Sequence, residues 1–232
     1  MNLADMAADI AAKKPTLFRR VFVFAGSFDP FAIHHLEIVG KLIELKRLMM
    51  VTDPSVPVDI VVWPISAYAS KQQVAAAEDR KGMLERGLAG LDVVLQLDDL
   101  LHDSFGYTST YEMQNKLALQ HHTELQHEYF VSNPSVITEV WHVIGADNVD
   151  HIKEWNEGRN LWERARFIVI ARPGYEPVKL PPRSVLLVGE TFRGTSCTNI
   201  RTLIAVNEPW EHFVPEPVAD YIKTRGFYQP KR

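Results

Sequence analysis

Short apolar runs alternate along the chain with longer segments of helical spacing, and this alternation restricts the possible folds more than any other feature. The runs are rich in β-branched and aromatic residues and occupy positions 21–25, 59–63, 93–97, 140–144, 167–170 and 184–188. Several are apolar at consecutive positions, as is typical of strands buried on both faces of a parallel sheet. Helical spacing marks residues 36–46, 75–90, 109–123, 148–164, 197–206 and 216–224. The sequence therefore predicts a doubly wound, Rossmann-like α/β fold, a parallel sheet with helices on both faces.

The length of 232 residues suits a single domain, or one domain with a small appendage. We expect residues 19–232 to form that domain. Residues 1–18 precede the first strand, and Leu3, Met6 and Ile10 have the spacing of a short amphipathic helix. We expect this extension to cap the sheet or to be loosely held, and docking of a partner is the alternative.

Charge and cysteine content exclude several classes of protein. Twenty-five Lys and Arg residues against 29 Asp and Glu residues give a net charge of −4, without the basic excess of a general nucleic-acid binder. The single cysteine, Cys197, excludes an intrachain disulfide framework and a zinc site built on cysteines. No apolar stretch approaches the roughly 18 residues of a membrane span, and the first residues lack the features of a signal peptide. We therefore expect a cytoplasmic protein without nucleic-acid or membrane partners.

The segment GSFDPFAIHH, residues 26–35, leaves the first strand, turns and enters a helix. In an open α/β sheet, ligands bind at the carboxyl ends of the strands, and a helix N-terminus at that edge attracts an anion. Gly26 allows close approach of the backbone to a phosphate, and His34 and His35 stand at the helix entrance, where an imidazole can bond a phosphate oxygen. The segment predicts a phosphate-binding turn, and an ordinary turn before a solvated helix start is the alternative.

A second helix start follows near the C-terminus, in TSCTNIR, residues 195–201. Ser196 and Thr198 are good N-cap residues for a helix whose free amides can hold a phosphate. Arg201 lies one turn further on, and its planar guanidinium can donate to two phosphate oxygens. A capped structural helix with a surface arginine is the alternative.

Residues 26–35 resemble the nucleotidylyltransferase signature G-x-F-D-P-x-[HT]-x-G-H, and within that superfamily the chain resembles the nicotinate/nicotinamide mononucleotide adenylyltransferases. The resemblance implies that His35 contacts the ATP phosphates and stabilises the transition state. It also implies that the backbone of Gly26, Ser27 and Phe28 lies along ATP. Ala32 stands where the signature has His or Thr and cannot donate to a phosphate. His34 stands where Gly is usual and is the candidate replacement, although adjacent side chains on a helix diverge by about 100°.

Two more segments resemble ATP-binding motifs of this family. Residues 195–201 are similar to I-S-S-T-x-I-R, with Thr195 in place of Ile and Cys197 in place of the second Ser. This implies that Ser196, Thr198 and Arg201 bind ATP, with Arg201 also catalytic. Residues 144–147, IGAD, resemble the family's G-A-D, which implies that Gly145 and Asp147 bind ATP, the aspartate through a ribose hydroxyl.

The resemblance also implies a mononucleotide site. Lys153-Glu154-Trp155 is similar to the family's K-W step, whose tryptophan stacks on the pyridine ring. Asn156 follows it and is a candidate reader of nicotinamide. Residues 106–110, GYTST, resemble the S-Y-T-x-x-T of bacterial nicotinate enzymes, whose backbone amides read the pyridine carboxylate. Four further candidates complete the set: Tyr107 and Thr108 in that loop, and Ser66 and Lys71 after the second strand.

The implied reaction transfers AMP from ATP to a pyridine mononucleotide, forming NAD or its deamido form plus pyrophosphate. The attacking phosphate is already an anion, so no general base is needed. ATP is then a substrate, and Mg²⁺ is expected to be held by its phosphates and water, so we name no metal-ligand residues. Another nucleotidylyltransferase of the same superfamily and a non-catalytic nucleotide-binding or sensor module are the alternatives. The sequence leaves a homo-oligomer and the nicotinate or nicotinamide preference open.

Overall fold

A computed structural model describes residues 16–65, 74–97, 100, 108–118, 135–171, 174–175, 179–187 and 195–229. Its strands are β1 (Thr16–Gly26), β2 (Val58–Pro64), β3 (Val94–Leu95), β4 (Ser135–Gly145), β5 (Arg166–Ile170) and β6 (Ser184–Leu187). Its helices are α2 (Ile33–Thr52), α3 (Ala77–Gly87), a helix over residues 110–118, the 3₁₀ helix η2 (Ala146–Glu154), α6 (Gly158–Arg164), α7 (Cys197–Ala205), the 3₁₀ helix η3 (Glu211–Phe213) and α8 (Glu216–Arg225).

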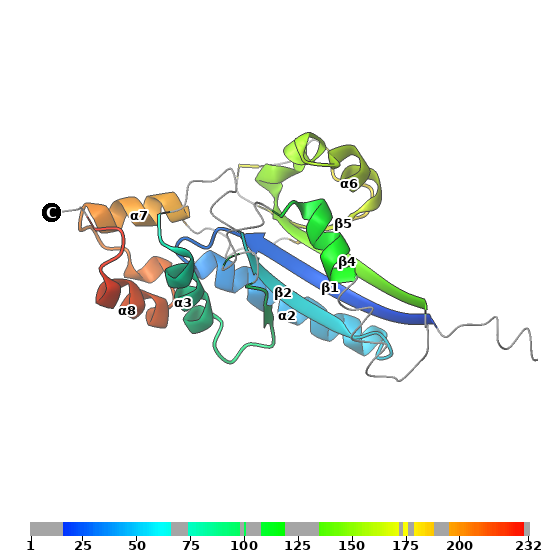
Figure 1. Cartoon of the computed structure of the whole chain (residues 1–232), viewed down its shortest axis with the longest axis horizontal. Coiled ribbons are helices and arrows are strands. Elements are labelled where there is room, and N and C mark those ends of the chain that lie inside the picture. The colour runs from blue at the N-terminus through cyan, green and yellow to red at the C-terminus, as the bar shows by residue number, and fades with distance from the viewer. Residues whose placement is uncertain are drawn as a thin grey trace, which may run out of the picture.

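The six strands form one sheet in the order β3-β2-β1-β4-β5-β6, and every pair is parallel. The strand order reverses direction between β1 and β4, the two long strands at the centre of the molecule (Figure 1). This is the doubly wound order in which a crevice opens between the two central strands at their carboxyl ends. The predicted fold class is confirmed.

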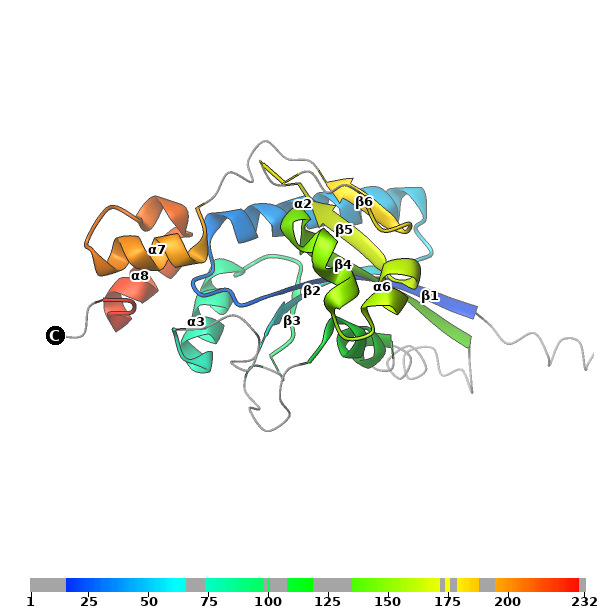
Figure 2. The ribbon, with the colours of Figure 1, turned by 90° about the horizontal axis from the view of Figure 1, so that it is seen from above.

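The consecutive apolar residues of the strands divide between two cores. Phe22 and Phe24 of β1 face α2, α3, α7 and α8, whereas Val21 and Val23 face the helix at 110–118. Phe167 of β5 lies on that second side and packs against η2 and α6. Figure 2 shows α2 and the helix at 110–118 on opposite sides of the sheet. Both faces are buried, as the continuous apolar runs predict.

Helices α7 and α8 lie beyond the carboxyl ends of the central strands, next to α3 (Figure 1). Two glycines of α3 permit this close packing. A Cβ atom on Gly82 would lie 2.6 Å from the Tyr221 hydroxyl of α8, and one on Gly87 would press on the Phe31 ring. The N-terminus of α7 faces the turn between β1 and α2, where Cys197 Sγ donates to the Pro30 carbonyl at 3.4 Å.

Three predicted boundaries differ from the structure. Strand β1 begins at Thr16, five residues before the apolar run at 21–25 that predicted it, and residues 1–15 lie outside the described residues. The expected strand at 93–97 is paired only at Val94–Leu95. The single helix expected at 148–164 is wrong, because the segment forms η2 and α6 with a break at Trp155–Glu157, where Glu157 has a φ of +56°. Within the described part of the chain, no helix combines the length and apolar character that crossing a membrane requires.

Candidate active site

The predicted ATP-binding residues gather at the crevice between β1 and β4. Gly26 is the last residue of β1 and Gly145 the last of β4. Phe24 pairs with Val143, so two residues further on the two glycines end adjacent strands side by side. Ser27 and Phe28 then continue from one strand and Asp147 from the other. The position is the topological switch point of the sheet, where α/β proteins of this kind bind ligands.

The turn after β1 is held in a fixed shape. Phe28 has a φ of +48°, an uncommon value for a bulky residue, and its ring is buried. That ring lies over Gly26, where an added Cβ would be 3.1 Å from it. The buried Arg80 of α3 donates from Nη1 to the carbonyls of Ser27 and Ile65, both at 2.9 Å. A side chain at position 26 would therefore press on the Phe28 ring, which favours glycine there for a reason besides close approach of a phosphate.

Asp29 connects this turn to distant segments of the chain and is almost fully buried, with 1% of its surface exposed. Its carboxylate accepts hydrogen bonds from the backbone N–H groups of Val74 (2.7 Å) and Ala75 (3.3 Å) and from the Tyr228 hydroxyl (2.6 Å). Burial, followed by the negative charge of Asp29, raises the pKa of Tyr228 far above its usual range, so the hydroxyl remains a donor. Arg201 lies 3.8 Å from the same carboxylate. These contacts connect the turn to α7 and to the C-terminal segment.

His35 stands at the third position of α2, and its two ring nitrogens have different roles. Its Nδ1 accepts a hydrogen bond from the Ala32 backbone N–H at 3.0 Å, as an acidic residue does in a capping box. An accepting Nδ1 in a neutral ring places the proton on Nε2. The ring also packs edge-on against Phe28, with centroids 5.0 Å apart. The backbone of the turn thus fixes His35 as an Nε2–H donor at the head of the helix.

His34 does meet His35, contrary to the expected divergence of adjacent helical side chains. The two Nε2 atoms lie 3.1 Å apart, and the ring centroids are separated by 4.1 Å. Since His35 carries its proton on Nε2, His34 is the acceptor in this contact. Both side chains are half-buried in the first turn of α2. The position that the family signature gives to glycine therefore adds a second imidazole beside the first.

Helix α7 presents the second set of predicted residues. Ser196 is its N-cap, and the Ser196 hydroxyl accepts a hydrogen bond from the Asn199 backbone N–H at 3.1 Å. The Arg201 guanidinium donates from Nη1 to the Asp29 carbonyl at 2.6 Å and from Nη2 to the Thr198 hydroxyl at 3.2 Å. These bonds use part of the five-donor fork. They hold Arg201 beside the turn after β1, so two segments more than 160 positions apart form one site.

A second group of predicted residues lies beyond β4. The Asn156 side-chain amide donates to the Ser109 hydroxyl at 3.3 Å, which brings the turn after Trp155 against the start of the helix at 110–118. Thr108 is buried there and accepts a hydrogen bond from the Lys116 ammonium at 3.1 Å. The Trp155 ring is half-buried against the core under η2 and α6. The contact of Asn156 with Ser109 thus brings the segment that holds Trp155 and Asn156 next to the segment that holds Thr108.

Six further residues matter for the comparison of the predicted site with the structure. Ser66, Lys71 and Tyr107 lie outside the described residues. Sequence reasoning assigned no role to Asp29, Arg80 or Tyr228. Asp29 is part of the segment at residues 26–35 that resembles the family signature, and that signature could have identified it. Arg80 and Tyr228 reach the turn from 53 and 199 positions away along the chain, and no local spacing reveals such contacts.

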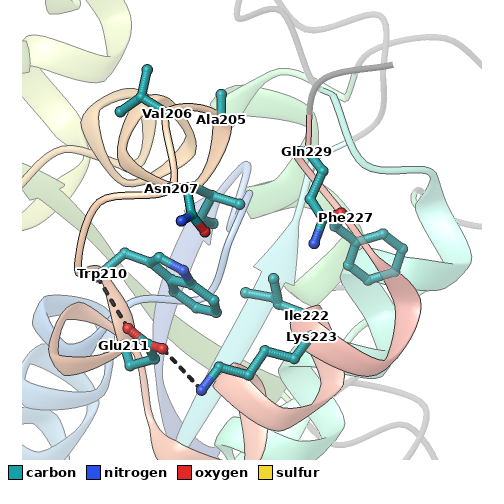
Figure 3. Close-up of a pocket in the computed structure, with 10 residues that line it drawn as sticks. Ala205, Val206, Asn207, Trp210, Glu211, Ile222, Lys223, Phe227 and Gln229 are labelled. Atoms are coloured by element: carbon teal, nitrogen blue, oxygen red, sulfur yellow. Dashed lines mark hydrogen bonds and ion pairs between the residues drawn. The ribbon is translucent and has the colours of Figure 1, made fainter. Parts of the chain in front are cut away.

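A pocket of about 480 Å³ lies at the other end of α7, between that helix, η3 and α8. Trp210, Ile222 and Phe227 line it, and the ion pair of Glu211 with Lys223 at 2.9 Å crosses its rim (Figure 3). The hydrogen bond from Lys223 lowers the pKa of Glu211 to about 2. None of the predicted site residues lines this pocket. It is separate from the crevice between β1 and β4.

The parallel sheet, the switch-point crevice and the donors converging on it from α2 and α7 define a Rossmann-type nucleotide-binding protein. Residues 23–212 match the family described as cytidylyltransferase-like. The match covers most of the chain, and the chain belongs to this family.

Two relatives and one solved structure show how far the similarity extends. The chain is 28% identical over 214 residues to the "Probable nicotinate-nucleotide adenylyltransferase" of Thermus thermophilus, covering 90% of this chain and all of the other. It is 26% identical to the protein of the same name from Lactiplantibacillus plantarum, covering 91% and 89%. The structure of Plasmodium falciparum nicotinic acid mononucleotide adenylyltransferase with NaAD has a TM-score of 0.65 at 18% identity, covering 90% and 97%. At that identity the solved structure supports the fold.

Proposed function

We propose that this protein is a pyridine mononucleotide adenylyltransferase that acts on nicotinate mononucleotide. The observation that carries the proposal is the match, over about nine-tenths of the chain, with relatives named as nicotinate-nucleotide adenylyltransferases. The arrangement of His35, Arg201 and the head of α7 around one crevice supports it independently.

The reaction joins two phosphates. A phosphate oxygen of the mononucleotide attacks the α-phosphorus of ATP and forms a new phosphoanhydride bond. The bond from that phosphorus to the oxygen bridging to the β-phosphate breaks, and pyrophosphate leaves with the electron pair. The attacking oxygen is already ionised, so the enzyme has to align two anions and neutralise their charge. A site built from N–H donors and a guanidinium fits this task.

His35 and Arg201 are the catalytic residues in this proposal. His35 Nε2–H, in the tautomer fixed by Ala32, exchanges its contact with His34 for a phosphate oxygen and donates to that oxygen as charge grows on it. Arg201 offers the donors of its guanidinium that Asp29 and Thr198 leave available. Gly26, Ser27 and Phe28 line the nucleotide, and the capped N-terminus of α7 contributes its free backbone amides. His34, Gly145 and Asp147 complete the proposed ATP contacts.

Magnesium is expected to enter with ATP. It prefers oxygen ligands in octahedral geometry and retains several waters. Most of the groups around the crevice are imidazole, guanidinium and backbone N–H groups. Of its two carboxylates, that of Asp29 is enclosed by its own hydrogen bonds, and that of Asp147 is assigned to the ribose of ATP. This donor set fits an ion carried by the phosphates. When bound, Mg²⁺ would neutralise charge on the phosphates, and no side chain of the described crevice is assigned to it.

The mononucleotide is placed beside Trp155. Stacking of an aromatic ring on a pyridinium is favourable through both ring contact and cation–π attraction. Asn156 contacts Ser109, the neighbour of Thr108, and Thr108 and Asn156 are the further candidates for contact with the mononucleotide. Ser66, Lys71 and Tyr107 remain proposed contacts from the sequence.

The test measures pyrophosphate release from ATP and Mg²⁺, with nicotinate or nicotinamide mononucleotide supplied separately. We expect release that depends on a mononucleotide, with the higher kcat/KM for the nicotinate form. Release with phosphopantetheine alone would assign another activity of the superfamily. ATP binding without release in any arm would identify a non-catalytic module, and either result would overturn the proposal.

A further inference from the structure

A cluster of soft metal-binding side chains lies at the head of α2. His34, His35 and Cys197 each contribute one ligand atom, and these three atoms all lie within 4.8 Å of one another. The two histidines come from the first turn of α2, and the cysteine is the first residue of α7. All three side chains are half-buried. The sequence gives no sign of this cluster, because it has one cysteine and the two histidines are distant from Cys197 in the chain.

The spacing of the ligand atoms suits one tetrahedral ion. Zinc binds imidazole nitrogen at about 2.0–2.1 Å and thiolate sulfur at about 2.3 Å, so two nitrogens on one zinc are separated by roughly 3.3 Å. The two Nε2 atoms are 3.1 Å apart. Cys197 Sγ now donates to the Pro30 carbonyl at 3.4 Å, so it already points toward the turn before α2. The three ligand atoms lie within 4.8 Å of one another, so side-chain rotation is what a common centre still requires.

We propose that His34, His35 and Cys197 form a binding site for a soft divalent transition-metal ion, with Zn²⁺ as the expected occupant. Nitrogen and sulfur ligands favour zinc and cobalt over magnesium, which prefers oxygen. Three protein ligands leave one coordination position for water. The site is distinct from the magnesium that accompanies ATP, both in its ligands and in being held by the protein.

Binding of the metal ion changes the protonation of Cys197 and the tautomer of His35. Binding requires the Cys197 thiolate, so one proton leaves the thiol, and the N-terminus of α7 stabilises the resulting negative charge. His34 already presents an accepting Nε2. In His35 the proton moves from Nε2 to Nδ1, and the hydrogen bond from the Ala32 N–H is given up. Occupation therefore releases one proton per ion and tightens as the pH rises.

The bound metal ion and the triphosphate of ATP cannot both use the Nε2 atom of His35. A ring nitrogen that coordinates a metal has no proton to donate to a phosphate. Zn²⁺ is thus a reversible inhibitor that competes with ATP. This consequence rests on the proposed function, whereas occupation of the site by a metal does not.

Cobalt(II) titration of the purified chain, followed by absorption spectroscopy, tests occupation directly. We expect one Co²⁺ per chain, with the near-ultraviolet cobalt–thiolate band and the intense visible bands of tetrahedral Co²⁺, both removed by an equivalent of Zn²⁺. Cys197→Ser should abolish the thiolate band. His34→Ala should weaken Co²⁺ binding at least tenfold, whereas His151→Ala, which removes an exposed histidine of η2, should leave it unchanged. A wild-type chain without a thiolate band, or equal affinity in the two alanine variants, would overturn the proposal.

Inhibition of pyrophosphate release by Zn²⁺ provides the second measurement, with each variant compared with its own uninhibited rate. We expect Cys197→Ser and His34→Ala to raise the zinc concentration for half-inhibition at least tenfold. A chain that binds Co²⁺ as described and releases no pyrophosphate would contradict only the proposed function. A chain that is active, lacks the thiolate band and has the same zinc sensitivity in all variants would contradict only the metal site.

Discussion

The two ring nitrogens of His35 connect the backbone of the turn to the chemistry of the crevice. One nitrogen accepts from Ala32 and the other is thereby committed to donation. Phe28 and Phe31 pack against the ring, with centroids 5.0 and 5.6 Å away, so the donor is held in place before any ligand arrives. In the structure this donor is engaged by His34 Nε2 at 3.1 Å, so a phosphate oxygen has to replace that ring. The tautomer and the ring position of His35 are already set, and fixed donors of this kind contribute strongly to catalysis.

Removal of this donor gives the first prediction. His35→Ala should lower kcat for pyrophosphate release at least a hundredfold, in line with the roughly 3 kcal/mol of transition-state stabilisation that one such donor supplies. Circular dichroism and the melting temperature should show a folded chain. His151→Ala is the matched control and should keep the wild-type rate. A folded His35→Ala enzyme with turnover within about threefold of wild type would remove His35 from the mechanism.

Asp29 gives the second prediction, because its buried carboxylate depends on the Tyr228 hydroxyl 2.6 Å away. Tyr228→Phe should reduce the free energy of unfolding by about 1.5–3 kcal/mol, the range for a hydrogen bond to a charged group. Tyr221→Phe is the control: its hydroxyl lies 3.5 Å from Asp79, and its loss should cost less than about 0.5 kcal/mol. Urea denaturation measures both variants. Equal losses would show that the hydroxyl of Tyr228 does not support the turn.

At the scale of elements, Trp155 lies at the break between η2 and α6, and this break fixes its position. Glu157 adopts a left-handed conformation, and Gly158 follows as the first residue of α6. A Cβ atom on Gly158 would overlap the carbonyl oxygen of Ile152 and approach the Lys153 carbonyl carbon to 2.7 Å. Since those neighbours are backbone atoms, they cannot yield as a flexible side chain would. The sharp turn therefore depends on this glycine.

Gly158→Ala should disturb this turn and with it the position of Trp155. We expect KM for nicotinate mononucleotide to rise at least fivefold and the free energy of unfolding to fall by about 1–3 kcal/mol. Gly40→Ala in α2 is the control, because its Cβ would meet no atom within 4 Å. That change should be neutral or stabilise by up to about 1 kcal/mol. Identical behaviour of the two variants would contradict the account of the break.

The sequence predicts the elements better than the contacts between them. Continuous apolar runs locate the six strands. Of the two residues suited to cap α7, Ser196 is the N-cap, whereas Thr198 lies inside the helix and accepts a hydrogen bond from Arg201. The break at Trp155–Glu157 was missed because helical spacing continues through it in the sequence. The bonds from Arg80 and Tyr228 to the turn depend on tertiary packing between distant segments, which no local pattern encodes. The contact of His34 with His35 was likewise invisible, since it depends on ring rotamers in one helical turn.

At the scale of the whole molecule, burial of both faces of the sheet makes the stability of the protein depend on pH. His142 lies in β4 with 3% of its surface exposed, against the Phe167 ring and 3.4 Å from the Gln114 side chain. Burial lowers the pKa of His142 from 6.5 to about 4. The folded protein therefore holds this ring neutral over a range in which the unfolded chain takes up a proton.

Stability should consequently fall as the pH decreases from about 6.5 to about 4 and be independent of this group above that range. The difference in pKa corresponds to about 3 kcal/mol of unfolding free energy lost by pH 4. Urea denaturation at several pH values measures the slope. His142→Asn, which cannot titrate, should lack this component, and His151→Asn should retain it. The same slope in both variants would show that His142 is not the titrating group.

Isotope tracing tests most directly whether the protein transfers the AMP group of ATP at the crevice between β1 and β4. The enzyme is incubated with Mg²⁺, nicotinate mononucleotide and ATP labelled either at the α-phosphate or at the γ-phosphate, and the products are separated. We predict that the α label appears in a dinucleotide and the γ label in pyrophosphate, with both signals reduced at least a hundredfold in His35→Ala. Transfer of the γ label to the mononucleotide, or a dinucleotide without the α label, would contradict the account.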